Sequence, residues 1–328
     1  MVSLRDVITN LLKEMKKVGI FRAVGIFVFT IILWRYKNFY LLKKMKETGT
    51  KTLKIKLFNN SPFFIFLDDL GLSFDLFIAR KREIIITDYL LSFLKKNTLK
   101  TFVDIGANIG YYTIILSPFF KRIISIEPSP KAFSLLKKNV TINKLDKKVE
   151  LLNLAIVSKK DYNKDIYISE EKCLNISSIT SHGKTKVKKV NFSEILTKYK
   201  PDFIKMDIEG YEFELIEDLK NSRHIPKYIF MEVHVNKNNY IQNKKFFRAL
   251  ARMKYKIRIT TIEYKDFYYL KNNGIIWSLF YDLYAFFTSK NKHIIAKNCS
   301  INDFLRNSEA VRGSLGAIEF LLERCDQK

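Results

Sequence analysis

The sequence predicts an α/β protein whose sheet is mostly parallel, with an antiparallel last strand and helices on both faces. Two observations indicate this fold. Between residues 99 and 300, apolar stretches of strand length alternate with stretches of helix length, which is the pattern of a parallel sheet covered by helices. One short stretch is followed by a glycine-rich turn, residues 106–110, and then by a helical stretch, as in many ligand-binding βα turns.

The composition excludes several broad classes. Hydrophobic residues make up 47% of the 328 residues, with only 11 Gly and 6 Pro, so the chain is neither disordered nor fibrous. Its three cysteines, Cys173, Cys299 and Cys325, are far apart and form no Cys-x-x-Cys pair. This favours a reducing compartment over a disulfide framework and predicts a cytoplasmic location.

The charge is strongly positive, with 58 Lys and Arg against 33 Asp and Glu and a formal net charge of +25. Such a surplus raises the local concentration of anions, whether nucleic acid, lipid head groups or nucleotide-linked substrates. The lysines are spread along the chain in pairs rather than gathered in one arm. This favours a solvated basic surface, and the charge alone does not choose a partner.

Residues 1–50 are predicted to form a basic and apolar helical leader. An apolar run over 23–34 is flanked by lysines and arginines between 13 and 46. Twelve helical residues extend ~18 Å, short of the ~30 Å hydrocarbon core of a bilayer. Three interpretations remain open: a helix packed on the domain, a helix lying on an anionic membrane surface at the cytosolic face, and a marginal span. Arg22 and the short run favour lying at the interface over spanning.

The remaining elements follow in order. Residues 51–98 are predicted to hold a β-hairpin, with strands at 53–58 and 63–67, and a helix over 84–94. Residues 99–300 are predicted to form the main α/β domain, with a polar insertion over 161–189, and residues 301–328 a helical tail. Strands are expected at 101–105, 122–126, 150–154, 203–207, 228–234, 257–262 and 294–297, and helices at 111–119, 131–143, 211–219 and 244–253.

The first candidate site is the turn after the strand at 101–105. It reads Asp-x-Gly-x-x-x-Gly, with Asp104, Gly106, Asn108 and Gly110, and not the Gly-x-Gly-x-x-Gly of dinucleotide sites. Turns of this kind aim backbone N–H groups at an anion at the helix N-terminus. A carboxylate at position 104 would repel a pyrophosphate but suits a ligand with a cationic centre.

A second carboxylate, Glu127, ends the next strand, 23 residues after Asp104. An acidic residue at this spacing is placed to accept hydrogen bonds from both hydroxyls of a ribose. The two carboxylates and the glycine turn describe a nucleoside site beside a positive charge. S-adenosylmethionine fits that description better than a dinucleotide does.

A third cluster lies at the ends of two later strands. Asp207 and Glu209 follow the strand at 203–207, while Glu232 and His234 end the strand at 228–234. The carboxyl ends of parallel strands meet at one edge of a sheet. We therefore expect this cluster at the same edge as Asp104 and Glu127.

These segments resemble the FkbM family of S-adenosylmethionine-dependent methyltransferases. The likeness rests on residues 102–110, Ile-Glu-Pro-Ser-Pro at 126–130, residues 153–157, Lys-Met-Asp-Ile-Glu-Gly-Tyr-Glu at 205–212, and residues 232–234. It implies a Rossmann-like class I methyltransferase fold and S-adenosylmethionine as cofactor. It further implies methylation of a hydroxyl group on a sugar, a glycan or a related small molecule.

The resemblance also implies roles for individual residues. Asp104, Gly106, Asn108, Gly110 and Glu127 would bind the cofactor, and Asn153 would meet the adenine edge. The candidates for the base are Glu209 and His234, with Asp207 as the residue that orients them. The chain departs from the family pattern at 190–194, Val-Asn-Phe-Ser-Glu, on the acceptor side, which leaves the acceptor open.

Three other functions are less consistent with the sequence. A nucleic-acid (RNA) methyltransferase would place Asn-Pro-Pro-Tyr where Asp207–Gly210 stands, and carboxylates there would repel phosphates, so no nucleic-acid partner is expected. An NAD-dependent oxidoreductase lacks its third glycine. A non-catalytic, membrane-associated binding protein of the same fold would have no need of the acidic edge. No spacing resembles a metal cage, so no metal is expected.

Overall fold

A computed structural model of the chain describes residues 47–69, 72–168, 179–180, 185–208, 210–234, 240–262, 294–307 and 317–325. Almost all of them belong to one compact unit, residues 51–263 and 294–328. Within these ranges no helix combines the length and the apolar character needed to cross a bilayer. The apolar run of the leader, and with it the predicted membrane contact of residues 13–46, lies outside the described residues.

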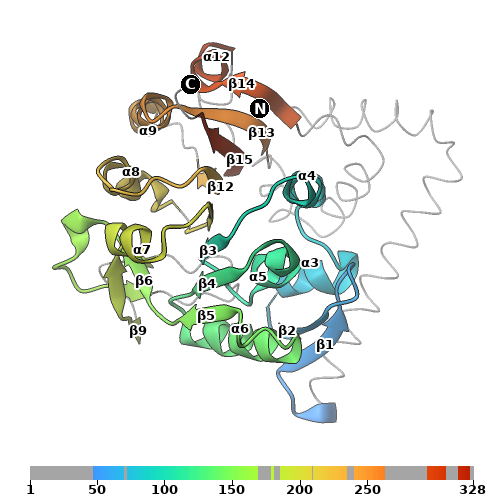
Figure 1. Cartoon of the computed structure of the whole chain (residues 1–328). Coiled ribbons are helices and arrows are strands. Elements are labelled where there is room, and N and C mark those ends of the chain that lie inside the picture. Colours follow the sequence, from blue (N-terminus) through green and yellow to red (C-terminus); the bar gives the residue numbers. More distant parts are fainter. Residues whose placement is uncertain are drawn as a thin grey trace, which may run out of the picture. The chain divides into compact units, whose positions relative to one another are not determined.

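The unit is built on a sheet of eight strands in the order β14-β13-β15-β12-β11-β3-β4-β5 (Figure 1). The five strands from β5 to β12 in that order pair in parallel, whereas the pairs β12–β15, β15–β13 and β13–β14 are antiparallel. The predicted fold class is therefore confirmed. The strands are β3 (Thr101–Ile105), β4 (Arg122–Ile126), β5 (Val149–Leu152), β11 (Phe203–Met206), β12 (Tyr228–His234), β13 (Tyr255–Ile262), β14 (Ile294–Ser300) and β15 (Ala317–Arg324).

The prediction of a helical tail over 301–328 is wrong for its second half. Among the described residues of that stretch, α12 (Ile301–Asn307) is helical, while β15 inserts between β12 and β13 and pairs with both. Glu319 and Glu323 lie four residues apart, a spacing that also suits one face of a helix. Pairing with two neighbouring strands overrides that local pattern and buries Phe320 and Leu322 completely.

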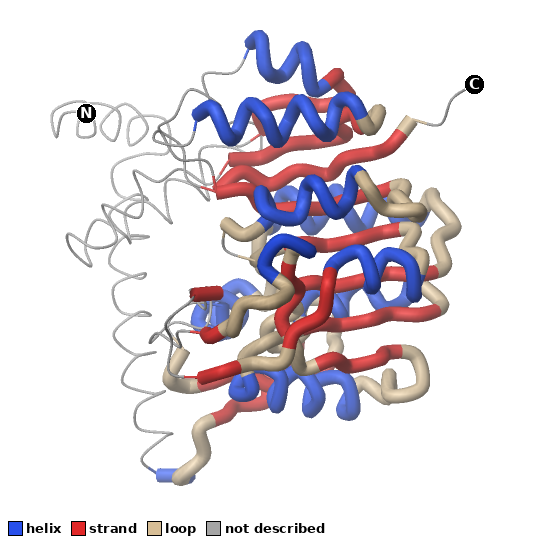
Figure 2. Tube along the Cα trace, turned by 90° about the vertical axis from the view of Figure 1, so that its left-hand side faces the viewer, coloured by secondary structure: helices blue, strands red, loops and turns tan. Residues whose placement is uncertain are grey.

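Helices cover both faces of the sheet, and the two helical layers lie on opposite sides of it in Figures 1 and 2. Side chains alternate along each strand, so Phe102 of β3 joins one hydrophobic cluster and Val103 joins the other. The first cluster lies under α4 (Ile84–Lys95), α5 (Tyr111–Leu116) and α6 (Pro130–Ile142). The second lies under α7 (Phe192–Tyr199), α8 (Glu212–Lys220), α9 (Tyr240–Arg252) and α12.

The lead-in segment, residues 51–98, is part of this unit. The predicted hairpin is present as β1 (Thr52–Lys56) and β2 (Pro62–Phe66), followed by α3 (Leu72–Ala79). The fully buried Asn139 of α6 ties β2 to the glycine turn: its Oδ1 accepts from Phe64 N (2.6 Å), and its Nδ2 donates to Phe64 O (3.0 Å) and to Ile109 O (2.8 Å). The hairpin and the turn therefore hold each other in place.

The predicted insertion contains short strands. β7 (Tyr167–Ile168) pairs antiparallel with both β8 (Ile179–Thr180) and β9 (Thr185–Lys186). At its base, β6 (Ala155–Val157) pairs in parallel with β10 (Lys189–Asn191), which leads into α7. Two 3₁₀ turns, η1 (Ser117–Phe119) and η2 (Lys159–Asp161), complete the described elements.

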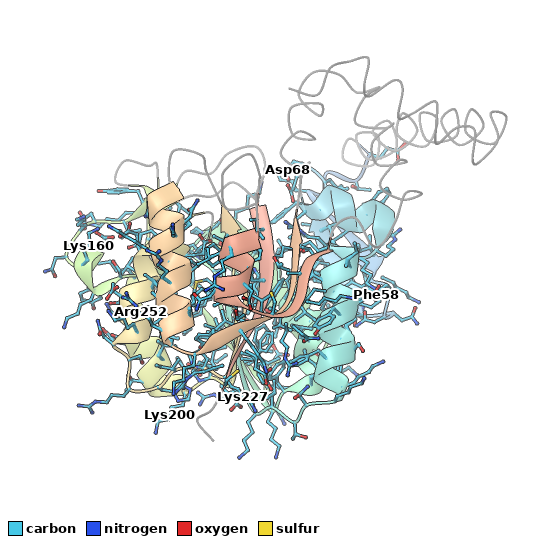
Figure 3. All side chains as sticks on the ribbon, turned by 90° about the horizontal axis from the view of Figure 1, so that it is seen from above. Phe58, Asp68, Lys160, Lys200, Lys227 and Arg252 are labelled. Atoms are coloured by element: carbon cyan, nitrogen blue, oxygen red, sulfur yellow. The ribbon has the colours of Figure 1, made fainter. Side chains whose placement is uncertain are left out.

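Six lysines lie along one edge of the sheet, where the parallel strands begin. A lysine directly precedes β3, β4, β5, β12 and β13, and Lys200 stands shortly before β11. Lys200 and Lys227 lie along this same edge in Figure 3. The lysines before the five strands are Lys100, Lys121, Lys148, Lys227 and Lys254.

Because β15 completes the sheet, truncating its core side chain should lower stability strongly. The ring of Phe320 packs against those of Phe247 and Phe304. We expect Phe320→Ala to lower the free energy of unfolding by about 3–5 kcal/mol, measured by urea denaturation followed by circular dichroism. Phe58→Ala, at a ring 36% exposed, is the control and should change it by less than about 1 kcal/mol. Equal losses in both variants would contradict the central place of β15.

Candidate functional site

A cavity opens at the carboxyl ends of β3, β4 and β11. It brings together four of the residues predicted from the sequence, Gly106, Asn108, Glu127 and Asp207. One part of its wall is apolar and the other part is ionic. The full lining is Leu72, Arg82, Glu83, Ile105, Gly106, Ala107, Asn108, Tyr111, Tyr112, Ile126, Glu127, Pro128, Leu154, Ala155, Ile156, Lys205, Asp207 and Ile208.

The glycine turn requires its glycines for two reasons. Gly106 and Gly110 have φ angles of +71° and +93°, in the left-handed region that favours glycine. A Cβ on Gly106 would lie 1.9 Å from the carbonyl oxygen of Asp207, and one on Gly110 would lie 2.6 Å from Cδ1 of Leu136. The turn therefore holds the backbones of β3 and β11 in direct contact at the cavity.

The N–H groups of this turn do not point at a ligand anion, in contrast to the expectation from the motif. Gly106 N and Ala107 N both donate to Ile126 O at 3.0 Å, and Asn108 N donates to Oε2 of Glu127 at 2.8 Å. The anion that the turn holds is thus the carboxylate of Glu127. This arrangement leaves no cradle for a pyrophosphate at the turn.

Glu127 is fixed from two sides at the cavity wall. Ser129 N donates to its Oε1 at 2.8 Å, opposite the bond from Asn108 N. The residue is 6% exposed, and burial raises the pKa of its carboxyl to about 7, although both N–H groups oppose that rise. A carboxylate held in this way is preorganised to accept hydrogen bonds from a ligand.

Asp104 lies beneath the turn and does not line the cavity. It is completely buried, and its Oδ2 accepts from Oγ1 of Thr113 at 2.6 Å, which anchors α5. Its Oδ1 has no hydrogen-bond partner among the described residues. Burial raises the pKa of this carboxyl, while the ammonium of Lys205 and the bond from Thr113 lower it. The structure therefore gives Asp104 a supporting position rather than a place on the cavity wall.

Asn153 also lies off the cavity wall. Its side chain is exposed, and its Nδ2 donates to Glu127 O (2.8 Å) and to Pro128 O (3.1 Å). Its amide therefore orients the backbone that carries Glu127. The apolar wall beside it comes from Leu154 and the first two residues of β6, Ala155 and Ile156.

Lys205 is a site residue that the sequence reasoning missed. This β11 side chain is 5% exposed; its Nζ donates to Gly106 O at 3.0 Å and lies 3.3 Å from Oδ2 of Asp207. Burial lowers the pKa of this ammonium, but the carboxylates of Asp207 and Asp104 outweigh that effect and raise it. The signal was present, because a lysine inside the apolar run Phe203–Met206 is rarely buried without a partner.

Three carboxylates lie on neighbouring strands at this edge. Asp207 follows the β11 residue that pairs with Met231, so its neighbour on β12 is Glu232, and Glu232 in turn lies opposite Glu319 of β15. Burial and the charges of Asp207 and Glu83 raise the pKa of Glu232 well above its usual value. Asp207 and Glu232, two of the four residues of the predicted cluster, therefore lie side by side at this edge.

Two of the predicted catalytic groups cannot be located relative to these three carboxylates. Glu209 and the side chain of His234 lie outside the described residues. The loop that carries Glu209 is held by Glu212, a buried carboxyl that accepts from Ile208 N (3.0 Å) and Gly210 N (3.3 Å). Burial raises the pKa of Glu212 to about 7. Nothing in the sequence around Glu212 marked it as the residue that closes this loop.

The cavity residues fit S-adenosylmethionine. Gly106 lines the cavity without a side chain, Glu127 can take a ribose, and residues 154–156 give an apolar wall for a base, whereas Gly110 packs on Leu136 and lies off the cavity wall. The ionic part of the wall suits the charged end of that ligand. No group of three or more His, Cys, Asp or Glu suited to a metal occurs within the described ranges.

The comparison with protein families decides which group of enzymes this site belongs to. The family model of the methyltransferase FkbM domain matches residues 104–293. The chain belongs to this family. With it, the chain joins the S-adenosylmethionine-dependent methyltransferases, as the resemblance of its motifs predicted.

Two curated relatives and two solved structures extend the comparison. The "Probable S-adenosylmethionine-dependent methyltransferase CRG1" of Saccharomyces cerevisiae is 35% identical over 79 residues, 23% of this chain and 27% of that protein. The "Hexuronic acid methyltransferase AglP" of Haloferax volcanii is 23% identical over 164 residues, 48% of this chain and 64% of that protein. The chain thus spans less than two thirds of either relative.

TYW2 of M. jannaschii in complex with AdoMet is 12% identical, with 84% of this chain and 88% of that chain covered and a TM-score of 0.39. The putative transferase PH0793 of Pyrococcus horikoshii is also 12% identical, with 90% and 86% covered and a TM-score of 0.43.

The contact between β3 and β11 predicts a large difference between two glycine variants. Gly106→Ala must move the backbone at Asp207, whereas Gly49→Ala shares the positive φ but meets nothing within 4 Å. We expect Gly106→Ala to abolish binding of S-adenosylhomocysteine and to lower the melting temperature by more than 5 °C. Gly49→Ala should lose only the ~1 kcal/mol of a left-handed alanine and bind normally. Calorimetry and thermal melts measure both, and normal binding by Gly106→Ala would contradict the close approach.

The raised pKa of Glu127 predicts a pH dependence of cofactor binding. Only the ionised carboxylate accepts from two ribose hydroxyls, so affinity should rise as the pH passes upward through about 7. With that pKa, the ionised fraction grows about tenfold between pH 6 and pH 8. We expect a similar gain in affinity for S-adenosylhomocysteine by calorimetry. Glu127→Gln should bind more weakly and show no such rise; a rise that persists in this variant would assign the titration to another group.

Proposed function

We propose that the protein transfers the methyl group of S-adenosylmethionine to a hydroxyl of a sugar or glycan. The observation that carries this proposal is the composition of the cavity. A ribose-binding carboxylate stands on one side, and a carboxylate paired with a buried lysine stands on the other. The likeness to a hexuronic acid methyltransferase supports a sugar acceptor.

The donor end is formed by Glu127 and the apolar wall. Two backbone N–H groups hold the carboxylate oxygens of Glu127 at 2.8 Å, so its orientation is set before a ligand arrives. The cofactor, when bound, supplies an electrophilic methyl group. The task left to the protein is to place an acceptor oxygen in line with that group and to receive its proton.

The acceptor end is proposed to lie along the carboxylates of β11 and β12. Asp207 lines the cavity beside Lys205, and Glu232 is its neighbour on β12. Carboxylates accept hydrogen bonds from hydroxyl groups, and a sugar offers several of these. Glu209 and His234 come two residues after Asp207 and Glu232 in the sequence, and we assign the proton transfer to one of them, with Asp207 orienting the acceptor.

The distribution of charge argues against a nucleic-acid acceptor. Among the described residues, the lysines that precede the parallel strands lie at the edge opposite the cavity, while the cavity edge carries Asp207, Glu232 and Glu319. The cations of the cavity wall, Arg82 and Lys205, each lie beside a carboxylate of the protein. A phosphate backbone binds where cations gather. It would therefore be drawn away from the site of methyl transfer.

The reaction is tested with radiolabelled S-adenosylmethionine and three acceptors: a uronic-acid glycan, a neutral hexose glycan and a tRNA transcript. We expect alkali-stable label in a glycan. Glu209→Gln or His234→Ala should lower kcat by ~10²–10⁴-fold, the usual contribution of a positioned base, with unchanged cofactor affinity. Glu214→Gln, on α8 and paired with Lys160, is the control with normal turnover. Transfer to tRNA alone would overturn the proposed acceptor, and normal kcat in both base variants would overturn their role.

A further inference from the structure

Two cavity residues come from a turn that precedes the family-matched segment. Arg82 and Glu83 lie between α3 and α4, and both line the cavity opposite the glycine turn. The match to the family begins only at residue 104. Its residues belong to none of the sequence motifs that indicated the cofactor site.

The turn is fixed to the first residues of α5. Arg82 N donates to Oη of Tyr111 at 3.0 Å, and Oγ1 of Thr87 donates to Arg82 O at 2.8 Å. Oη of Tyr112 donates to the carboxylate of Glu83. Because α5 starts directly after Gly110, the position of Arg82 is coupled to that of the glycine turn.

The turn adds a charged pair to the ionic part of the cavity. Nε of Arg82 lies 2.6 Å from Oε1 of Glu83, and the two side chains are 21% and 18% exposed. A guanidinium has five N–H donors in a planar fork, so it can bind one carboxylate through Nε and still bind another. Lys205 is less suited to a ligand carboxylate, because Gly106 O and Asp207 already accept from its ammonium.

The two parts of the wall differ in the ligand groups that they suit. Glu127 and the apolar residues 154–156 suit an uncharged nucleoside. The remaining wall carries Arg82, Glu83, Lys205 and Asp207, with both signs of charge. In S-adenosylmethionine the part beyond the nucleoside is an α-amino acid, which carries one ammonium and one carboxylate.

We propose that the Arg82–Glu83 turn recognises the α-amino-acid end of the methyl donor. The Arg82 guanidinium binds the α-carboxylate, and Glu83 is a positioning residue that holds the guanidinium through Nε. This inference rests on the proposed function, because it takes S-adenosylmethionine as the donor. It assigns to the lead-in segment a direct part in cofactor selection.

The experiment compares two ligands that share the nucleoside but differ at that end. S-adenosylhomocysteine has the α-amino acid, whereas 5′-methylthioadenosine lacks it. We expect Arg82→Gln to weaken S-adenosylhomocysteine ~10–100-fold, the scale of a charge-assisted pair of hydrogen bonds. Its affinity for 5′-methylthioadenosine should stay within about twofold of the wild type. Arg82→Lys keeps the positive charge but lacks the planar fork of donors. Its affinity for S-adenosylhomocysteine should lie between those of the wild type and Arg82→Gln.

The matched control is Lys81→Gln in the same turn. It removes the same charge, but Lys81 pairs with Asp88 and does not line the cavity, so neither ligand should change. Glu83→Gln should weaken S-adenosylhomocysteine by a smaller factor than Arg82→Gln and leave 5′-methylthioadenosine unchanged. Circular dichroism and calorimetry on the full chain provide the measurements.

Each other outcome overturns the inference in a recognisable way. Equal weakening of both ligands by Arg82→Gln and Arg82→Lys assigns Arg82 to the structure of the cavity. Unchanged affinity for both ligands, with a raised KM for the acceptor, assigns it to the acceptor. A wild-type protein that binds 5′-methylthioadenosine and S-adenosylhomocysteine equally well has no α-amino-acid subsite. A wild-type protein that binds neither contradicts the proposed function itself.

Discussion

The site depends on how closely the backbone at Gly106 approaches the backbone at Asp207. These residues follow neighbouring strands of the sheet, and Asp207 N donates to Ile105 O at 3.2 Å. The space that a Cβ would need at Gly106 is filled by a carbonyl oxygen. The ammonium of Lys205 joins the same two residues from one side. Without this contact the carboxylate of Glu127 and the ionic wall would not share one cavity.

In the ionic wall, buried positive and negative groups compensate one another's charge. Removing the Lys205 ammonium from water is unfavourable, and it is offset only because the carboxylates of Asp207, Asp104 and Glu83 act on it together. Burial raises the pKa of Asp104, and the same ammonium partly opposes that rise. A change at one of these groups therefore leaves the others buried without their counter-charge.

The sequence predicted what local patterns determine and missed what distant contacts determine. The strands at 101–105, 122–126 and 228–234 have the predicted bounds. Each is a short apolar run between turn residues, which set both ends of the strand. The glycine turn and Glu127 were found by spacing. By contrast, the amide of Asn153 was assigned to adenine, yet it bonds to backbone 25 and 26 residues away. Arg82 and Glu83 are each held at the cavity by a tyrosine 29 residues further along, Tyr111 and Tyr112, and no local pattern encodes such a contact.

The place of β15 has a consequence for how the protein is made. Synthesis proceeds from the N-terminus, and domains begin to fold while the chain is still growing. β12 and β13 are complete long before residues 317–324 exist, but they pair with each other only through β15. Until then each strand presents an open edge to other nascent chains, which is the situation that favours aggregation. A chain that stops before residue 317 would have its sheet divided in two, with β12 and β13 each left without the strand that joins them.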